Sequence, residues 1–302
     1  MSEGRAPVVT RPVRAIDHVV LPVVSLDDAR ARYEALGFTV APNGLHPFGT
    51  ANANVYLPDG TFLEPLAVAS REPCWAEAER GNPFVRNDQS YRFRVSGEGF
   101  SHTVVTTDDA EADYHRYADA GYSDGPVVTF SRIAEDGAGE RTEVRFKLAF
   151  AADPRSPDAR FFSCETQAAP PRSERLTTHP NGATRIRRVV LSEPNPTDFQ
   201  YVLQEFLQQR DVEAHSFGMD ILAANATVEV LTPEGLAMHY GLVAPEGARG
   251  LLHQTFVVGV SDPLGARAWL EGHRVSFHER GERLIVPPAI GQGCPVVFEA
   301  ER

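Results

Sequence analysis

The sequence predicts an α+β fold made of four βαβββ units that pair two by two into two domains. The order of an apolar strand, a helix and further strands recurs four times along the 302 residues. A residue suited to cap a helix follows the first strand of every unit, and a stretch rich in Pro, Ser and Thr separates the second unit from the third. Self-similarity of this kind indicates repeated supersecondary units that complete a core by packing together.

The first unit begins with an apolar strand over residues 15–24. Ser25 starts a helix, with Asp28 three residues later in a capping-box arrangement, and Gly37 ends that helix. Two strands around a loop follow. A Pro-Asp-Gly turn at 58–60 then leads into a closing strand.

The second unit repeats this order from an apolar strand at 100–107. Its helix starts at Asp109, carries Tyr114 and Tyr117 on one face, and ends at Gly121. Three later strands follow, with the sequences GPVVTFSRI, TEVRFKLAFA and RFFSCET.

The third unit begins with the strand TRIRRVVLSEP, after which Asn195 caps a helix that has Pro196 in its first position. The fourth unit begins with LHQTFVVGV, and Ser261 or Asp262 caps its short helix. The later strands of these two units have the sequences DILAAN, TVEVLT, RVSFHE, RLIVPP and CPVVFEA.

The stretch 166–183 has no apolar periodicity and is typical of a linker between domains. We therefore expect a flexible tail over 1–13, an N-terminal domain over 14–167, a linker over 168–182 and a C-terminal domain over 183–302. Units one and two form the N-terminal domain in this prediction, and units three and four form the C-terminal domain.

The composition excludes several classes of function. Lys and Arg number 29 against 41 Asp and Glu, so the net charge is −12, and a chain this acidic is a poor partner for nucleic acid. No apolar run reaches the ~18 residues of a membrane span, and the N-terminal sequence lacks the apolar centre of a secretory signal. The three scattered cysteines form no disulfide framework or metal motif, which favours a reducing, cytoplasmic setting.

Four βαβββ units in two pairs resemble the vicinal oxygen chelate superfamily, which includes glyoxalase I, extradiol dioxygenases and antibiotic-resistance proteins. The resemblance covers residues 14–302, and the segment HPFGTAN is similar to bacterial glyoxalase-like domain proteins. It implies that two units face each other around an open cleft, with metal ligands on the first and last strands of each unit. It is specific for the fold and says little about the substrate.

Helix caps locate the equivalent first-strand positions. Counting seven residues back from each cap gives His18, His102 and Arg188 in the first three units, and Gln254 or Thr255 in the fourth. Two histidines therefore occupy one structural position in the N-terminal domain, and no histidine occupies it in the C-terminal domain. We expect the C-terminal domain to lack metal ligands.

The last strands supply two carboxylates, Glu64 and Glu165, in otherwise apolar sequence. A carboxylate in such a strand is solvated, paired or ligating, because burying a bare charge is costly. With His18 and His102 these glutamates match the His-Glu-His-Glu pattern of glyoxalase I, which implies one divalent metal (Zn, Ni, Fe or Mn). Either glutamate would then act as the catalytic base.

Two further segments suggest residues that bind the substrate. The loop HPFGTANAN offers a polar group from His46, Asn52 and Asn54, with Gly49 permitting close backbone approach. In the segment 82–94, Arg94 is a candidate for steering an anionic substrate, and the alternative is that the arginines of this segment are solvated on an exposed strand.

The function favoured by these features is a metal-dependent, glyoxalase-like lyase or isomerase. It would act through an enediolate on a small substrate with two adjacent oxygens. An extradiol dioxygenase that uses His18, His102 and Glu165 on Fe(II) is one alternative. A metal-free protein that binds and sequesters a small molecule is the other. In the C-terminal domain, Glu229 is expected to pair with Arg188, and whether the chain forms a homodimer stays open.

Overall fold

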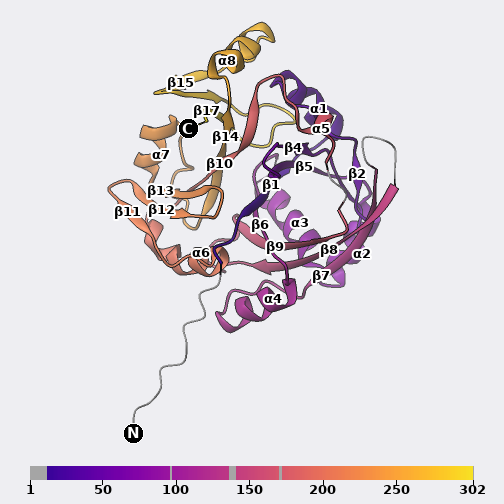
Figure 1. Cartoon of the computed structure of the whole chain (residues 1–302). Coiled ribbons are helices and arrows are strands. Elements are labelled where there is room, and N and C mark those ends of the chain that lie inside the picture. Colours follow the sequence, from indigo (N-terminus) through magenta and orange to yellow (C-terminus); the bar gives the residue numbers. More distant parts are fainter. Residues whose placement is uncertain (1–11, 96, 136–140, 170–171, 302) are drawn as a thin grey trace.

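The structure is a computed structural model that describes residues 12–95, 97–135, 141–169 and 172–301, so most of the predicted tail lies outside the described residues. Two curled sheets of nine and eight strands form its centre, and the segment between Gln167 and Ala183 joins them. Figure 1 shows the two sheets side by side, with indigo and magenta strands in one and orange and yellow strands in the other.

The first sheet, here called sheet A, contains units one and two in the order β2-β3-β5-β1-β6-β9-β8-β7, with β4 paired to β5. Its strands are β1 (Ile16–Pro22), β2 (Gly44–Leu45), β3 (Thr50–Asn52), β4 (Val55–Tyr56), β5 (Phe62–Val68), β6 (His102–Thr106), β7 (Val128–Glu135), β8 (Arg141–Ala151) and β9 (Arg160–Gln167). Its two central strands, β1 and β6, are antiparallel, and each has a parallel partner on its outer side.

The second sheet, sheet B, repeats this arrangement with units three and four in the order β11-β12-β13-β10-β14-β17-β16-β15. Its strands are β10 (Ala183–Ser192), β11 (Glu213–His215), β12 (Gly218–Leu222), β13 (Thr227–Leu231), β14 (Leu252–Val260), β15 (His278–Arg280), β16 (Arg283–Val286) and β17 (Val296–Ala300). Each pair of units thus builds one sheet around an antiparallel pair of first strands. The predicted fold class is confirmed.

One helix of each unit follows its first strand, as the caps predict. These helices are α1 (Leu26–Ala35), α4 (Ala110–Asp119), α6 (Gln200–Leu207) and α8 (Pro263–Gly272). The side chains of Ser25, Asp109 and Asp262 accept hydrogen bonds from backbone N–H groups of the first turn. Asn195 makes no such bond, because a 3-10 turn, η1 (Pro196–Phe199), precedes α6.

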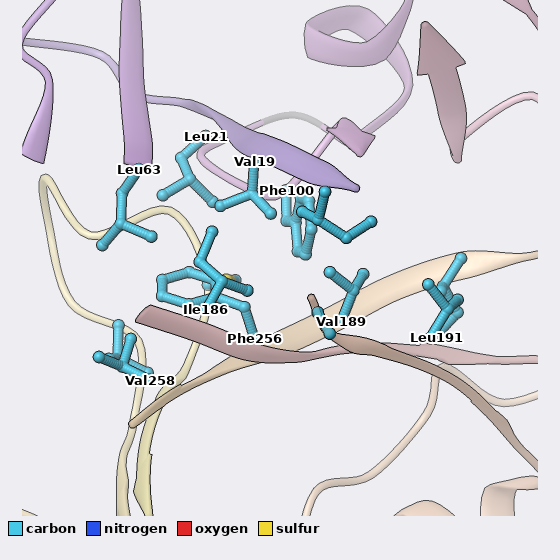
Figure 2. Close-up of a cluster of buried hydrophobic side chains, with 14 of the residues drawn as sticks. Val19, Leu21, Leu63, Phe100, Ile186, Val189, Leu191, Phe256 and Val258 are labelled. Carbon is cyan, nitrogen blue, oxygen red and sulfur yellow. The ribbon is translucent and has the colours of Figure 1, made fainter. Parts of the chain in front are cut away.

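The main hydrophobic core lies between the two sheets. Val19 and Leu21 of β1 face Ile186 and Val189 of β10 across this layer, and the four unit helices contribute further apolar side chains (Figure 2). Because side chains alternate along a strand, His18 and Val20 face the opposite, concave side of sheet A. The shared core therefore fixes the strand that carries the site.

Additional helices follow the strands β5 and β13 and cover the concave sides of the sheets. They are α2 (Arg71–Glu79) and α3 (Pro83–Val95) on sheet A and α7 (Pro233–Tyr240) on sheet B, while α5 (Glu174–Thr177) lies in the connecting segment (Figure 1). The expectation of an exposed strand over 82–94 was wrong, because α3 buries Phe84 and Val85 against the sheet. No helix among the described residues is long and apolar enough to span a membrane.

Candidate active site

A cavity of about 530 Å³ lies on the concave side of sheet A. Its walls are largely aromatic, and they include Phe62, Phe84, Phe130, Phe146 and Phe162. Beyond the end of β9, further lining residues are Ala168, Ala169, Arg172, Ser173 and Leu176. An apolar cavity with a few converging polar groups is the usual form of a small-molecule site.

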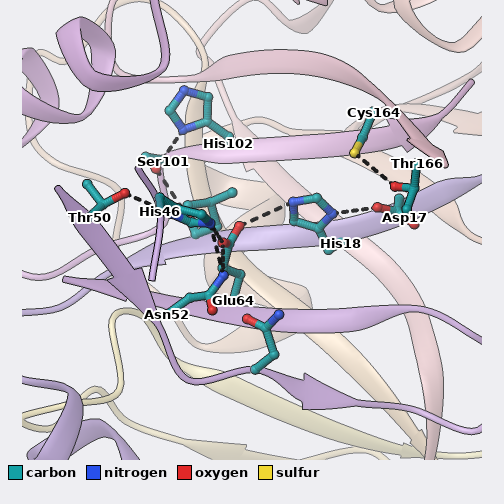
Figure 3. A network of polar contacts seen from close by, with 12 residues as sticks. Asp17, His18, His46, Thr50, Asn52, Glu64, Ser101, His102, Cys164 and Thr166 are labelled. Carbon is teal, nitrogen blue, oxygen red and sulfur yellow. Dashed lines mark hydrogen bonds and ion pairs between the residues drawn. The ribbon is translucent and has the colours of Figure 1, made fainter. Parts of the chain in front are cut away.

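The polar floor of this cavity is a row of three side chains, shown in Figure 3. His18 Nδ1 lies 2.7 Å from Asp17 Oδ2, and His18 Nε2 lies 3.3 Å from Glu64 Oε2. Strand pairing explains the second contact, because Glu64 of β5 lies beside Val20 of β1 and shares its concave face. The imidazole also stacks on Phe62 at a ring distance of 4.2 Å.

The His18–Glu64 contact is a buried ion pair. Burial opposes the charged imidazole, but hydrogen bonds from His18 to Asp17 and Glu64 raise its pKa to about 9. Burial likewise opposes ionisation of Glu64, yet the bond to His18 and the neighbouring charge lower the pKa of this carboxyl to about 2. At neutral pH His18 is therefore protonated and Glu64 ionised.

The segment between β2 and β4, which includes β3, supplies the second group of polar side chains. Asn52 Nδ2 donates to Glu64 Oε1 at 2.6 Å, and His46 Nδ1 lies 2.8 Å from Thr50 Oγ1. Burial lowers the pKa of His46 to about 4, so this imidazole is neutral. Asn54 also lines the cavity, and its buried Oδ1 has no hydrogen-bond partner among the described residues.

Gly49 allows this segment to approach α2. Its φ is +93°, and a Cβ at this position would lie 2.5 Å from the backbone oxygen of Ser70. The predicted residues His46, Asn52 and Asn54 therefore line the same cavity as His18 and Glu64.

His102 lies on the same concave face, but aromatic rings separate it from the floor. Its ring packs edge-on against Phe162 at 5.6 Å, and His18 packs against the same phenyl ring at 5.6 Å. His102 Nδ1 contacts Ser101 Oγ at 2.8 Å, while Nε2 is buried without a hydrogen-bond partner among the described residues (Figure 3). Burial lowers the pKa of His102 to about 3.

Strand register explains why Phe162 lies there. Glu64 pairs with Val20, two residues after His18, and Phe162 pairs with Val104, two residues after His102. Phe162 is thus the second unit's equivalent of Glu64, so a phenyl ring occupies the place expected for the second carboxylate.

Glu165 lies on the opposite face of β9, and the predicted four-ligand set is corrected at this position. Its Oε2 accepts a hydrogen bond from the backbone N–H of Ala110 at the start of α4, at 3.1 Å, and its other oxygen accepts from Gln167. Ser163, two residues earlier on the same face, contacts Tyr117 of α4 at 2.6 Å. Glu165 therefore stabilises the start of a helix rather than facing the cavity.

The family pattern implies a metal, and the side chains present do not form the expected four-ligand site. Of the four predicted ligands, only His18 and Glu64 meet. No group of three or more His, Cys, Asp or Glu side chains is arranged to hold a metal ion in the part of the chain that the structure describes. The Asp17–His18 bond is the kind of contact that orients a metal-bound histidine, but it equally orients a protonated one.

Arg94 does not reach the cavity either. It is exposed on α3, and its guanidinium makes hydrogen bonds of 2.7 and 3.1 Å to Asp158. The arginines that do line the cavity are Arg132 of β7 and Arg172, and neither was selected from the sequence. Period-two alternation along β7 could have placed Arg132 on the face of Phe130, and nothing in the local sequence indicates the fold-back of Arg172.

The concave face of sheet B carries different side chains at the equivalent positions. Arg188 donates to Glu229 at 2.6 Å, as expected, and Tyr240 of α7 donates to the other oxygen of Glu229 at 2.6 Å. Leu236 and Tyr240 pack on this face among buried aliphatic side chains.

Comparisons with known proteins agree with this fold. The family model described as a glyoxalase-like domain matches residues 16–207. A search of curated proteins found no match.

Three solved structures each cover 96% of this chain. They are a hypothetical protein from Staphylococcus aureus (14% identity, 100% of that chain, TM-score 0.63), a mutant of 4-hydroxymandelate synthase from Streptomyces coelicolor (11%, 92%, 0.57) and a Mn(II)-bound glyoxalase from Novosphingobium aromaticivorans (12%, 83%, 0.55). At these identities the likeness concerns the fold alone. The chain belongs to the glyoxalase-like domain family, within the vicinal oxygen chelate superfamily.

Proposed function

We propose that the cavity of sheet A binds a small substrate with two adjacent oxygens, and that Glu64 and His18 transfer a proton at the carbon beside them. The observation that carries this proposal is the buried ion pair at the floor of an apolar cavity. Active sites concentrate such perturbed titratable groups, because acid and base must be poised in one place.

The weakest bond in the row is the one a substrate would replace. His18 Nε2 lies 3.3 Å from Glu64, whereas Asp17 and Asn52 hold their partners at 2.7 and 2.6 Å. A substrate carbonyl oxygen that accepts the Nε2 proton of His18 takes the place of Glu64. The carboxylate then loses its main cationic partner, and burial raises its pKa. Binding would thus produce both a polarised carbonyl and a stronger base.

Glu64 and His18 together account for the proton and the electrons in this transfer. Glu64 takes the proton from the carbon next to the carbonyl, and the electrons of the broken C–H bond move to the carbonyl oxygen as an enolate. The protonated His18 stabilises that oxygen, held in orientation by Asp17. Glu64 returns the proton either to the former carbonyl carbon, while the proton of the neighbouring hydroxyl passes to the former carbonyl oxygen, which gives an isomer, or to the original carbon, which gives exchange.

Isotope exchange tests this proposal without knowledge of the product. The protein is incubated in D₂O with a panel of 2-hydroxyaldehydes, 2-hydroxyketones and 2-oxoaldehyde hemithioacetals, and loss of the C–H signal is followed by ¹H NMR. We expect exchange of at least one class above the buffer rate, with His18→Gln slower by about 100-fold. Treatment with a chelator should leave the rate unchanged.

Two results would overturn the proposal. Tight binding of panel members with no exchange would favour the metal-free sequestering protein. Loss of exchange on chelation, restored by one divalent ion, would favour the metal-dependent lyase or isomerase, with ligands other than the four selected from the sequence.

A further inference from the structure

Arg132 lines the cavity, and its guanidinium has no carboxylate partner among the described residues. Its only polar contact at hydrogen-bond distance among the described residues is Nη1 to Asn52 Oδ1 at 3.4 Å, and its buried Nε has no partner. The guanidinium lies 5.5 Å from the ring centre of Phe146. By contrast, Arg188 in sheet B contacts a carboxylate at 2.6 Å.

The neighbouring backbone makes room for this guanidinium. A Cβ at Gly44 of β2 would lie 1.9 Å from Arg132 Nη1 and 2.6 Å from Asn52 Oδ1. Any side chain at position 44 would therefore have to displace Arg132 from the cavity wall. The position of the guanidinium depends on a glycine that is not required by a positive φ.

Two guanidinium groups, those of Arg132 and Arg172, line the cavity, and neither forms an ion pair with a carboxylate among the described residues. A guanidinium without a carboxylate partner, in a wall of low polarity, strongly favours an anionic group on the ligand.

The side-chain amide of Asn52 lies between the guanidinium of Arg132 and the His18–Glu64 ion pair and contacts both. Its Nδ2 contacts Glu64 at 2.6 Å and its Oδ1 contacts Arg132 at 3.4 Å. A ligand carboxylate on Arg132 would therefore lie next to the carbon from which Glu64 is proposed to take a proton. The remaining volume is surrounded by phenylalanine rings, which suit a flat, apolar body.

We propose that Arg132 binds the carboxylate of the substrate, and that the substrate is a small aromatic acid whose ring occupies the phenylalanine-lined part of the cavity. This inference builds on the proposed function, since it names the substrate class for the same site. Its test uses unreactive ligands, so that it can succeed or fail independently of proton transfer.

Calorimetric titration with phenylacetate and 3-phenylpropanoate, against 2-phenylethanol and 3-phenylpropanol, measures the contribution of the carboxylate. We expect the full-length protein to bind at least one acid, and to bind it about tenfold to 100-fold more tightly than the matching alcohol. Arg132→Gln should remove this preference. Arg145→Gln is the matched control, because Arg145 is exposed on the adjacent strand and pairs with Glu143.

Gly44→Ala gives a second variant that keeps the charge but displaces the guanidinium, and it should also lose the preference. Glu64→Gln should still bind the acid, which separates this inference from proton transfer. The inference is overturned if the wild-type protein binds neither acid at millimolar concentration, if it binds acid and alcohol equally, or if a folded Arg132→Gln variant keeps the preference.

Discussion

The concave face of sheet A encloses a cavity with largely aromatic walls, whereas on the same face of sheet B α7 packs over Glu229 and a hollow beside it is lined by charged side chains such as Arg188, Arg283 and Glu299. Both faces carry a glutamate at the same register, since Glu64 pairs with Val20 and Glu229 pairs with Val190. In sheet A the partner of the glutamate is His18, which can give up its proton. In sheet B it is Arg188, which cannot.

The helices that cover the two concave faces also differ in what they place beside the glutamate. In sheet A, α2 and α3 pack at one side and leave the ion pair facing the cavity. In sheet B, α7 places the Tyr240 hydroxyl 2.6 Å from Glu229, so the carboxylate is fully bonded by its own chain. One topology therefore supports either a carboxylate that faces a cavity or one that is bonded by its own chain, depending on what covers the concave side.

Introducing a carboxylate at Phe162 should produce the largest change. Phe162→Glu places a fourth donor beside His18, Glu64 and His102, at the register equivalent to Glu64. We expect this variant to bind about one divalent metal per chain after reconstitution, measured by elemental analysis, because four converging donors suit such an ion. Phe146→Glu, which adds a carboxylate to another wall of the cavity, is the control. Equal metal content in the two variants would refute the assignment of Phe162.

Removing the cation in sheet B should reduce stability rather than ligand binding. Arg188→Met leaves Glu229 buried without its cation, at a cost of about 2–3 kcal/mol in the free energy of unfolding after allowance for partial exposure of Arg188. Urea unfolding measures this loss. Isotope exchange in sheet A, measured on the folded variant, should be unchanged, and a parallel loss of exchange would show that the two faces are not independent.

The Tyr240 hydroxyl should contribute a smaller amount. Tyr240→Phe removes one hydrogen bond to a buried carboxylate, which we expect to lower the free energy of unfolding by about 1–2 kcal/mol. The same substitution at Tyr201, which is exposed, serves as the control. An unchanged unfolding midpoint for Tyr240→Phe would mean that Glu229 does not need this bond.

The two histidines of sheet A should respond to pH in opposite directions. The folded pKa of His102 is lowered to about 3, so its contribution to stability is present above pH ~6.5 and is lost as pH falls toward 3. The folded pKa of His18 is raised to about 9, so its contribution is present below pH ~6.5 and is lost as pH rises through 9.

His102→Leu should therefore reduce the stability lost between pH 7 and pH 5 by about 2 kcal/mol. Urea unfolding at the two pH values measures this difference, and His278→Gln, an exposed histidine, provides the control. An acid sensitivity equal to that of the wild type would mean that folding does not lower the pKa of His102.

Much of this fold follows from local signals in the sequence. Capping residues and apolar strands predict the order of the units, and counting back from the caps places His18 and His102 on equivalent strands. The pairing of Arg188 with Glu229 also follows, because an arginine at a first-strand position has the adjacent carboxylate as its natural partner.

The second carboxylate was misplaced for a physical reason. The distance from turn to strand differs between units, whereas the pairing register does not, and a shift of three residues along β9 moves a side chain to the opposite face. Phe162 and Glu165 are separated by this shift. The helices α2 and α3 were missed because their buried faces are not plainly apolar: Cys74 is the buried residue of α2, and the buried residues of α3 include the polar Asn87 and Asp88.

The central claim is that Glu64 acts on the substrate and that Glu165 does not. Isotope exchange in D₂O with Glu64→Gln and Glu165→Gln compares two buried glutamates, each replaced by an amide that keeps one acceptor oxygen. We predict that Glu64→Gln loses exchange by more than about 100-fold while Glu165→Gln retains the wild-type rate. Equal loss in both variants, or retention in Glu64→Gln, would contradict the account.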